Sequence, residues 1–150
     1  MVLTKQVTDI LNGTIDSVKS VFPFEISIGN PSLFTQPYSQ HSMGVLIGMT
    51  GDVRGRLIID GDEGTFGKIG QGMFGMTLEG EMLESFAGEL GNMIAGSLST
   101  SISKQEIDMD ITTPTVLVGQ AKIYGFEKAF RLPITIQSAG NIVILLIIEQ

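Results

Sequence analysis

The residues best suited to chemistry lie in Ser85-Phe-Ala-Gly-Glu-Leu-Gly-Asn-Met-Ile-Ala-Gly96. On a helix with about 100° per residue, Glu89 and Asn92 project about 60° apart. Ser85 lies about 40° from Glu89, and Gly96 lies about 40° from Asn92, so both project within the arc between Glu89 and Asn92. The strip thus offers a carboxylate, which accepts hydrogen bonds, beside a neutral carboxamide, which donates and accepts them.

The same predicted helix contains three glycines, Gly88, Gly91 and Gly96. Each costs roughly 0.8–1 kcal/mol relative to alanine in a helix interior. The absence of a side chain can offset this loss of helix propensity in two ways. It can allow close packing against another helix or the sheet, or it can give clearance for a partner's backbone beside the acid and the carboxamide. The sequence favours neither explanation.

Other motifs have plainer explanations. Gly70-Gln-Gly-Met-Phe-Gly75 spells a dinucleotide-binding pattern but lies within a helical period, which predicts close helix packing. Asp108-Met-Asp-Ile-Thr112 is similar to the motif of aspartyl-phosphate phosphatases, but it follows a helix exit instead of an apolar strand, so we expect a solvated loop. A calcium loop starting at Asp60 lacks the required glycine and glutamate, so Asp60 and Asp62 are interpreted as a strand end and a helix cap.

The elements that position the strip follow from hydrophobic periodicity. Apolar residues at three- and four-residue steps predict helices over about 3–21, 66–74 and 81–103. Residues 30–41 hold two prolines and several small polar residues, which predict a loop. Apolar runs predict strands at about 24–28, 43–49, 53–59, 115–118, 129–137 and 141–149. The runs at 43–49 and 53–59 are predicted to form a hairpin. The run at 141–149 is expected to be a strand buried on both faces.

An internal echo suggests a diverged duplication. Gly13-Thr-Ile-Asp-Ser precedes Gly96-Ser-Leu-Ser-Thr by an offset of 83, and Pro31 precedes Pro114 by the same offset. Late in each half, the apolar run from Val53 is similar to that from residue 142, at an offset of 89. Each half is therefore predicted to run from a helix through an X-Pro step into strands.

Composition excludes several functional classes. The chain has 150 residues, a length typical of one domain, here 1–150. Its net charge of −7 disfavours nucleic acid and anionic membrane surfaces as partners. It has no cysteine and a single histidine, His41, which leaves no thiolate site and no two-histidine metal site. Neither a signal peptide nor a run of about 20 apolar residues is present, so a soluble, cytoplasmic protein is expected.

The strip resembles a known family. Gly88-Glu-Leu-Gly-Asn-Met-Ile-Ala-Gly96, followed by Asp110-Ile-Thr-Thr-Pro-Thr-Val-Leu-Val-Gly119, is similar to the CheC/CheX/FliY family of bacterial chemotaxis phosphatases, and most of all to its CheX members. The family pattern is Asp or Ser, three residues, Glu, two residues, Asn, and a later Pro. Ser85, Glu89, Asn92 and Pro114 meet this pattern, with positions 93–113 between the last two.

The resemblance implies an α+β fold, with a mixed, mostly antiparallel sheet, long helices packed on it and two pseudo-symmetric halves. It implies a phosphatase that hydrolyses the phosphoaspartate of a CheY-like response regulator. Asn92 would orient the attacking water, and Glu89 would pair with the regulator's lysine. Ser85, Gly88 and Gly96 would line the docking strip. The first half carries Gln6 and Asp9 where the second carries Glu89 and Asn92, so one active site is expected.

The resemblance also implies the partners. No metal or cofactor of the chain's own is expected, because the regulator would hold the Mg²⁺. A homodimer and regulation by a CheD-like protein are further expectations. The alternative is a non-catalytic module of the same fold that docks on a response regulator or a flagellar protein.

Overall fold

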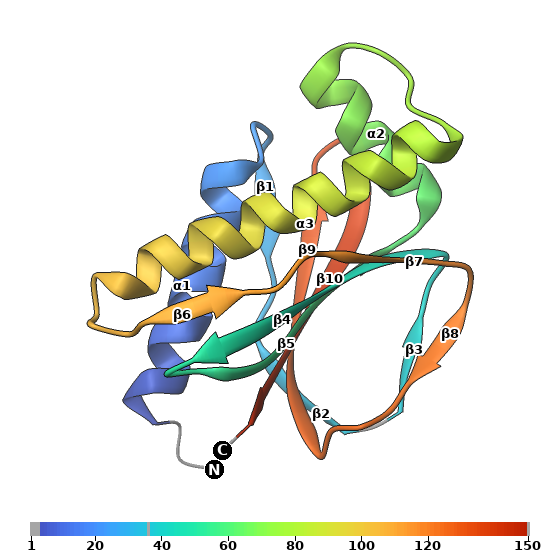
Figure 1. Ribbon diagram of the computed structural model, residues 1–150. Helices are drawn as coiled ribbons and strands as arrows, with labels where there is room; N and C mark the ends of the chain where they lie inside the picture. The colour runs from blue at the N-terminus through green and yellow to red at the C-terminus, as the bar shows by residue number, and fades with distance from the viewer. Residues whose placement is uncertain (1–3, 36, 150) are drawn as a thin grey trace.

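Two long helices, α1 (Lys5–Val21) and α3 (Gly80–Ser103), lie across one face of an antiparallel sheet (Figure 1). The computed structural model describes residues 4–35 and 37–149. A shorter helix, α2 (Glu63–Phe74), links the two halves. The strands are β1 (Ile26–Ile28), β2 (Ser32–Thr35), β3 (Tyr38–Gln40), β4 (Met43–Gly51), β5 (Arg54–Gly61), β6 (Met109–Ile111), β7 (Thr115–Val118), β8 (Ala121–Ile123), β9 (Lys128–Ile136) and β10 (Gly140–Glu149).

The helix ends have local causes. The Thr4 hydroxyl caps α1 by accepting from the Val7 N–H at 3.1 Å. Asp62 stands at the N-cap of α2, as predicted, but its side chain makes no capping bond. The Ser42 hydroxyl accepts from the Glu63 N–H at 2.8 Å instead, so the residue just before β4 supplies the cap.

The sheet contains the predicted duplication. Its order is β1-β9-β10-β5-β4-β6, with β2 beside β9 and β7 beside β4. The strands of the two halves correspond in pairs whose numbers differ by five, such as β1 with β6 and β5 with β10. Exchanging the members of every pair returns the same strand order, read from the opposite end of the sheet. The registers agree as well, since Leu33 pairs with Phe130 while Val116 pairs with Val45. The step along the chain from Leu33 to Val116 equals the offset of the sequence echo. The predicted fold of two pseudo-symmetric halves is confirmed.

The late strands are offset differently from the prediction. Val45 pairs with Ile59 in one half, and Phe130 pairs with Leu146 in the other. The last strands of the two halves are therefore related by an offset of 87 instead of 89. A two-residue slip preserves the alternation of side chains, so apolar strings match equally well at either offset.

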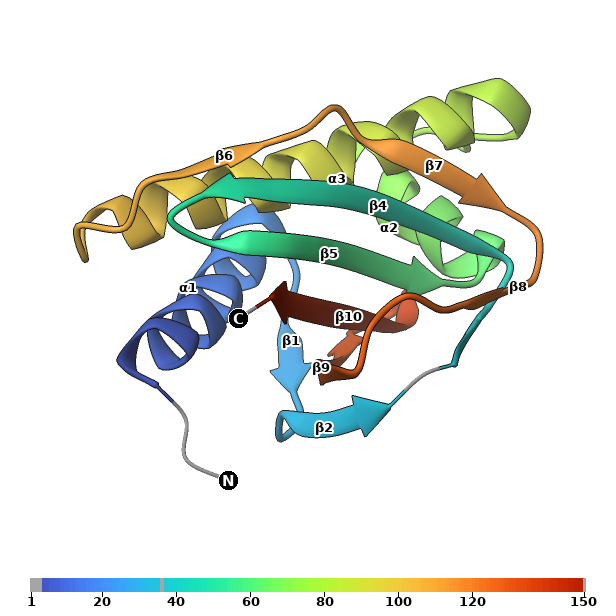
Figure 2. The ribbon, with the colours of Figure 1, turned by 60° about the horizontal axis from the view of Figure 1, so that its bottom comes forward.

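The two central strands are buried on both faces. Leu57 and Ile59 on β5 pack with the helices in one core, while Ile58 belongs to a second core. On β10, Ile144 and Leu145 divide in the same way, which confirms the burial predicted for this strand. The second core lies beneath β2 and the β3–β8 ribbon, on the sheet face away from α1 and α3 (Figure 2).

Two loop predictions are wrong. Residues 30–41 contain β2 and β3, and residues 108–112 contain β6. The strand β8 was not predicted at all. These strands are only three or four residues long, too short to show a clear apolar alternation. Pairing with β9, β8, β4 and β3 holds them in place. Within the described ranges, no helix has the length and hydropathy needed to cross a bilayer.

Candidate active site

An open hollow of about 520 Å³ lies between α3 and the connection from β6 to β7. Figure 1 shows these two segments of the backbone side by side. The α3 wall carries Ser85, Gly88, Glu89 and Asn92, four of the five predicted site residues. Glu89 and Asn92 are both exposed, so the carboxylate and the carboxamide stand together on the solvent side of the helix, as their spacing predicts. The remaining lining residues are Glu84, Ile111, Thr112, Thr113, Pro114 and Val116.

The buried face of α3 fixes the direction of this strip. Leu83, Phe86, Leu90 and Ile94 are buried in the main core, as predicted. A side chain at Gly91 would place its Cβ 2.6 Å from Val45 Cγ1 on β4. This glycine therefore serves close packing of the helix on the sheet.

The other two glycines differ from Gly91. A Cβ at Gly88 would lie 3.2 Å from Val116 Cγ2 across the hollow, so this glycine keeps the two walls close. A Cβ at Gly96 would have no atom within 4 Å. Gly96 lies outside the hollow, in a groove between α1 and α3 that Ser97 and Thr100 also line. Crowding explains Gly88 and Gly91 but not Gly96.

The opposite wall is tied to the sheet by Thr112. Its backbone N–H donates to the Gly48 carbonyl at 2.9 Å, and its hydroxyl accepts from the Gly48 N–H at 2.8 Å. Thr112 and Thr113, which line the hollow with Pro114, were not predicted as site residues. The X-Pro step in the family pattern was the available signal, because the residues just before it form this wall.

The charge of the hollow restricts its chemistry. Its lining includes two carboxylates, Glu84 and Glu89, and no lysine, arginine or histidine. Among the described residues, no group of three or more His, Cys, Asp or Glu side chains could hold a metal ion. A phosphoryl anion near Asn92 therefore needs positive charge from another molecule. The hollow can position a water molecule or a partner's cation, but it is poorly suited to hold a phosphate by itself.

The corresponding helix of the first half has no such strip. The Asp9 carboxylate is bound by Lys5 at 2.8 Å, and the Gln6 amide donates to the Asp52 carbonyl at 3.4 Å. These two positions, which the sequence echo aligns with Asn92 and Glu89, are therefore engaged within the chain.

A second polar cluster was missed. Asp60, almost fully buried, accepts from the Tyr38 hydroxyl at 2.7 Å and from the His41 N–H at 2.9 Å. Its Oδ2 also lies 2.6 Å from His41 Nδ1, so Asp60 is an acid partner of this histidine. The hydrogen bond to Asp60 raises the pKa of His41, and burial raises the pKa of Tyr38. Asp60 lies near the end of a strand, as predicted. Its bonds to Tyr38 and His41 were not predicted, because the sequence predicts a loop over residues 30–41.

Two of the three dinucleotide-like glycines, Gly70 and Gly72, lie inside α2, as expected, while Gly75 is its left-handed C-cap. A Cβ at Gly70 would approach Leu78 Cδ1 to 2.6 Å, and one at Gly72 would approach Phe24 Cε1 to 2.4 Å. Close packing accounts for both.

Comparison of the fold with known structures shows the class of protein to which it belongs. A CheC-like superfamily protein from Shewanella sp. PV-4 has a TM-score of 0.81 and 26% identity, covering 95% of this chain and 98% of its own. The CheX–CheY–BeF3–Mg²⁺ complex from Borrelia burgdorferi matches with a TM-score of 0.78 and 23% identity over 96% of this chain and 97% of that one. The fold is that of a CheC-like protein.

Sequence comparison narrows this class to one family. The family model described as chemotaxis phosphatase CheX matches residues 43–137. The CheY-P phosphatase CheX of Thermotoga maritima is 33% identical over 137 residues, which cover 88% of each chain. The chain belongs to the CheX family of chemotaxis phosphatases.

Proposed function

We propose that this protein hydrolyses the phosphoaspartate of a CheY-like response regulator and so terminates a chemotaxis signal. The observation that carries the proposal is the joint exposure of Glu89 and Asn92 at one hollow without cations. The relative from Thermotoga maritima bears the name CheY-P phosphatase, which supports the same reaction here.

The chemistry requires little from this chain. An acyl phosphate is a reactive anhydride, and phosphoryl transfer passes through a loose transition state, so a well-placed water molecule can suffice. Asn92 orients this water through its carboxamide. The water oxygen bonds to phosphorus as the bond from phosphorus to the aspartate oxygen breaks. The carboxylate leaves with the electron pair, and the water's proton passes to the phosphate.

Positive charge comes from the regulator. Glu89 pairs with a lysine beside the regulator's phosphoryl group and so anchors α3 there. The regulator also holds the Mg²⁺, a proposal supported by the presence of CheX, CheY and Mg²⁺ together in the Borrelia burgdorferi complex. Ser85 and Gly88 line the contact, and Gly96 extends it along the helix.

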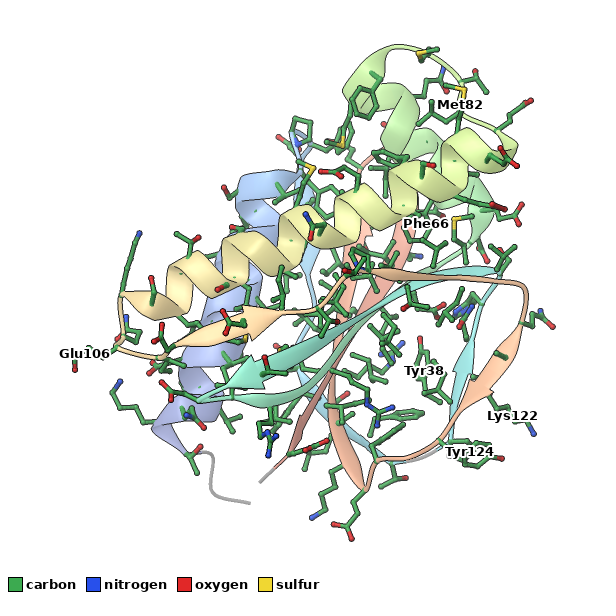
Figure 3. All side chains as sticks on the ribbon, in the orientation of Figure 1. Tyr38, Phe66, Met82, Glu106, Lys122 and Tyr124 are labelled. Carbon is green, nitrogen blue, oxygen red and sulfur yellow. The ribbon has the colours of Figure 1, made fainter. Side chains whose placement is uncertain are left out.

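The test measures phosphate release from a panel of phosphorylated regulators from the same cell. We expect the wild type to accelerate release from one of them, and both Glu89→Gln and Asn92→Ala to slow it. Glu106→Gln is the matched control, because this exposed glutamate lies in the turn after α3, far from the hollow (Figure 3). Normal rates in both site variants would refute the site. Binding without acceleration by the wild type would favour the non-catalytic docking module.

Three further features belong to the proposal. The protein acts in the cytoplasm, where response regulators reside. It forms a homodimer through an edge strand of the sheet, which sedimentation at equilibrium tests. A CheD-like protein regulates it, which is tested by adding that protein to the phosphate-release assay.

A further inference from the structure

We propose that three exposed apolar side chains near the hollow form a second docking surface for the same response regulator. This surface, the methionine ledge, consists of Phe74, Met76 and Met82, which are 59%, 51% and 56% exposed. The inference rests on the proposed function and adds to it the surface that sets the affinity for the regulator.

The methionine ledge extends the strip of candidate site residues toward the start of α3. Met82 lies two helical turns before Glu89 on α3, so it projects about 20° from Glu89 and about 10 Å along the axis. Figure 3 shows Met82 at the start of α3, beside the connection from α2. Phe74 ends α2 and meets the ring of Phe86 edge-on, with centroids 5.6 Å apart, which holds this part of the ledge against α3.

The size of a protein interface brings the ledge within reach of the regulator. A stable interface buries about 800 Å² on each partner, the area of a disc with a radius of about 16 Å. A contact centred on Glu89 therefore extends past Met82. The α3 wall of the hollow is mainly polar. Beyond Asn92, α3 presents Met93, which is only 37% exposed, and then Gly96, Ser97 and Thr100 in the groove beside α1. Toward the start of α3, the methionine ledge supplies large apolar side chains that can anchor a partner. Its methionines are flexible and can adapt to the partner's surface.

Charge identifies the kind of partner. Residues 69–103 contain no lysine, arginine or histidine but four glutamates, Glu79, Glu81, Glu84 and Glu89. A second copy of this chain would bring the same negative charge to the ledge, which opposes self-association there. The complementary surface is an apolar patch flanked by lysine or arginine, located next to the phosphorylated carboxylate of the regulator.

The experiment measures initial rates of phosphate release against the concentration of phosphorylated regulator. Met76→Gln and Met82→Gln, singly and together, remove apolar character while keeping side-chain length. Tyr124→Gln is the matched control, because Tyr124 is 58% exposed and lies beyond β8, away from α3 (Figure 3). We expect the double variant to raise KM about five- to tenfold with kcat within twofold, and the control to change neither. Glu81→Lys should also raise KM, and this increase should shrink at high salt.

The outcomes separate the two proposals. A wild type that does not accelerate phosphate release defeats the proposed function, and this inference with it. An active wild type whose KM is unchanged by the double variant overturns the inference alone. A change in oligomeric state of the double variant, measured by sedimentation, would also overturn it, because the ledge would then cover a second copy of this chain.

Discussion

Replacing Asn92 by alanine should separate activity from stability. Asn92 is exposed in the middle of α3, and the structure describes no hydrogen bond from its carboxamide to the rest of the described chain. Alanine forms helix better than asparagine by up to about 0.7 kcal/mol. For a domain of this size, such a gain corresponds to a Tm increase of roughly 1–3 °C. The fold should therefore tolerate the change or improve slightly.

The rate should fall sharply. The loss of one group that positions the reacting atoms costs about 2.7–4 kcal/mol, or roughly 10²–10³ in kcat. Asn12→Ala is the matched control, because Asn12 is an exposed asparagine on α1 and gains the same helix propensity. The assay is phosphate release at saturating phosphorylated regulator, with a thermal melt of each variant. If Asn92→Ala kept kcat within twofold of the Asn12→Ala value, the reasoning about a positioned water would be refuted.

Four further predictions follow from the packing and the polar cluster. Gly91→Ala should lower the stability to urea by about 1–3 kcal/mol, because its Cβ meets a valine of β4. Gly96→Ala should raise the stability by about 0.8–1 kcal/mol, because its Cβ has open space, and an equal loss at both positions would contradict this account. Tyr38→Phe removes one donor from buried Asp60 and should cost about 1–3 kcal/mol in the same measurement. The raised pKa of His41 means that its protonated form stabilises the fold below about pH 6.5, and this contribution is lost as pH rises through the raised pKa. Urea unfolding at pH 6 and pH 9 should thus find His41→Gln less stable than the wild type mainly at pH 6, and an equal difference at both pH values would contradict the pKa shift.

The candidate strip was predictable because helix geometry alone fixes it. Glu89 and Asn92 are three residues apart, and the apolar stripe through Leu90 and Ile94 determines which side faces the core. The long helices and the central strands were predictable for the same reason, since their periodicity reflects burial. The duplication was detectable because its offset is constant from the first helix to β2.

Features that depend on partners distant in sequence were not predictable. Thr112 reaches the hollow only because it is bonded to Gly48 on β4. The bonds of Asp60 to Tyr38 and His41 need β3, whose three residues are paired with β8. Strands as short as three residues carry no clear periodic signal, because tertiary pairing, not their own composition, holds them extended.

The most direct test of the central claim is an NMR titration of the isotope-labelled protein with its phosphorylated regulator. If α3 inserts its carboxamide into the regulator's active site, the side-chain amide resonances of Asn92 shift on addition, while those of Asn12 stay in place. Resonances that shift elsewhere on the protein while the Asn92 amide remains unperturbed would contradict the claim.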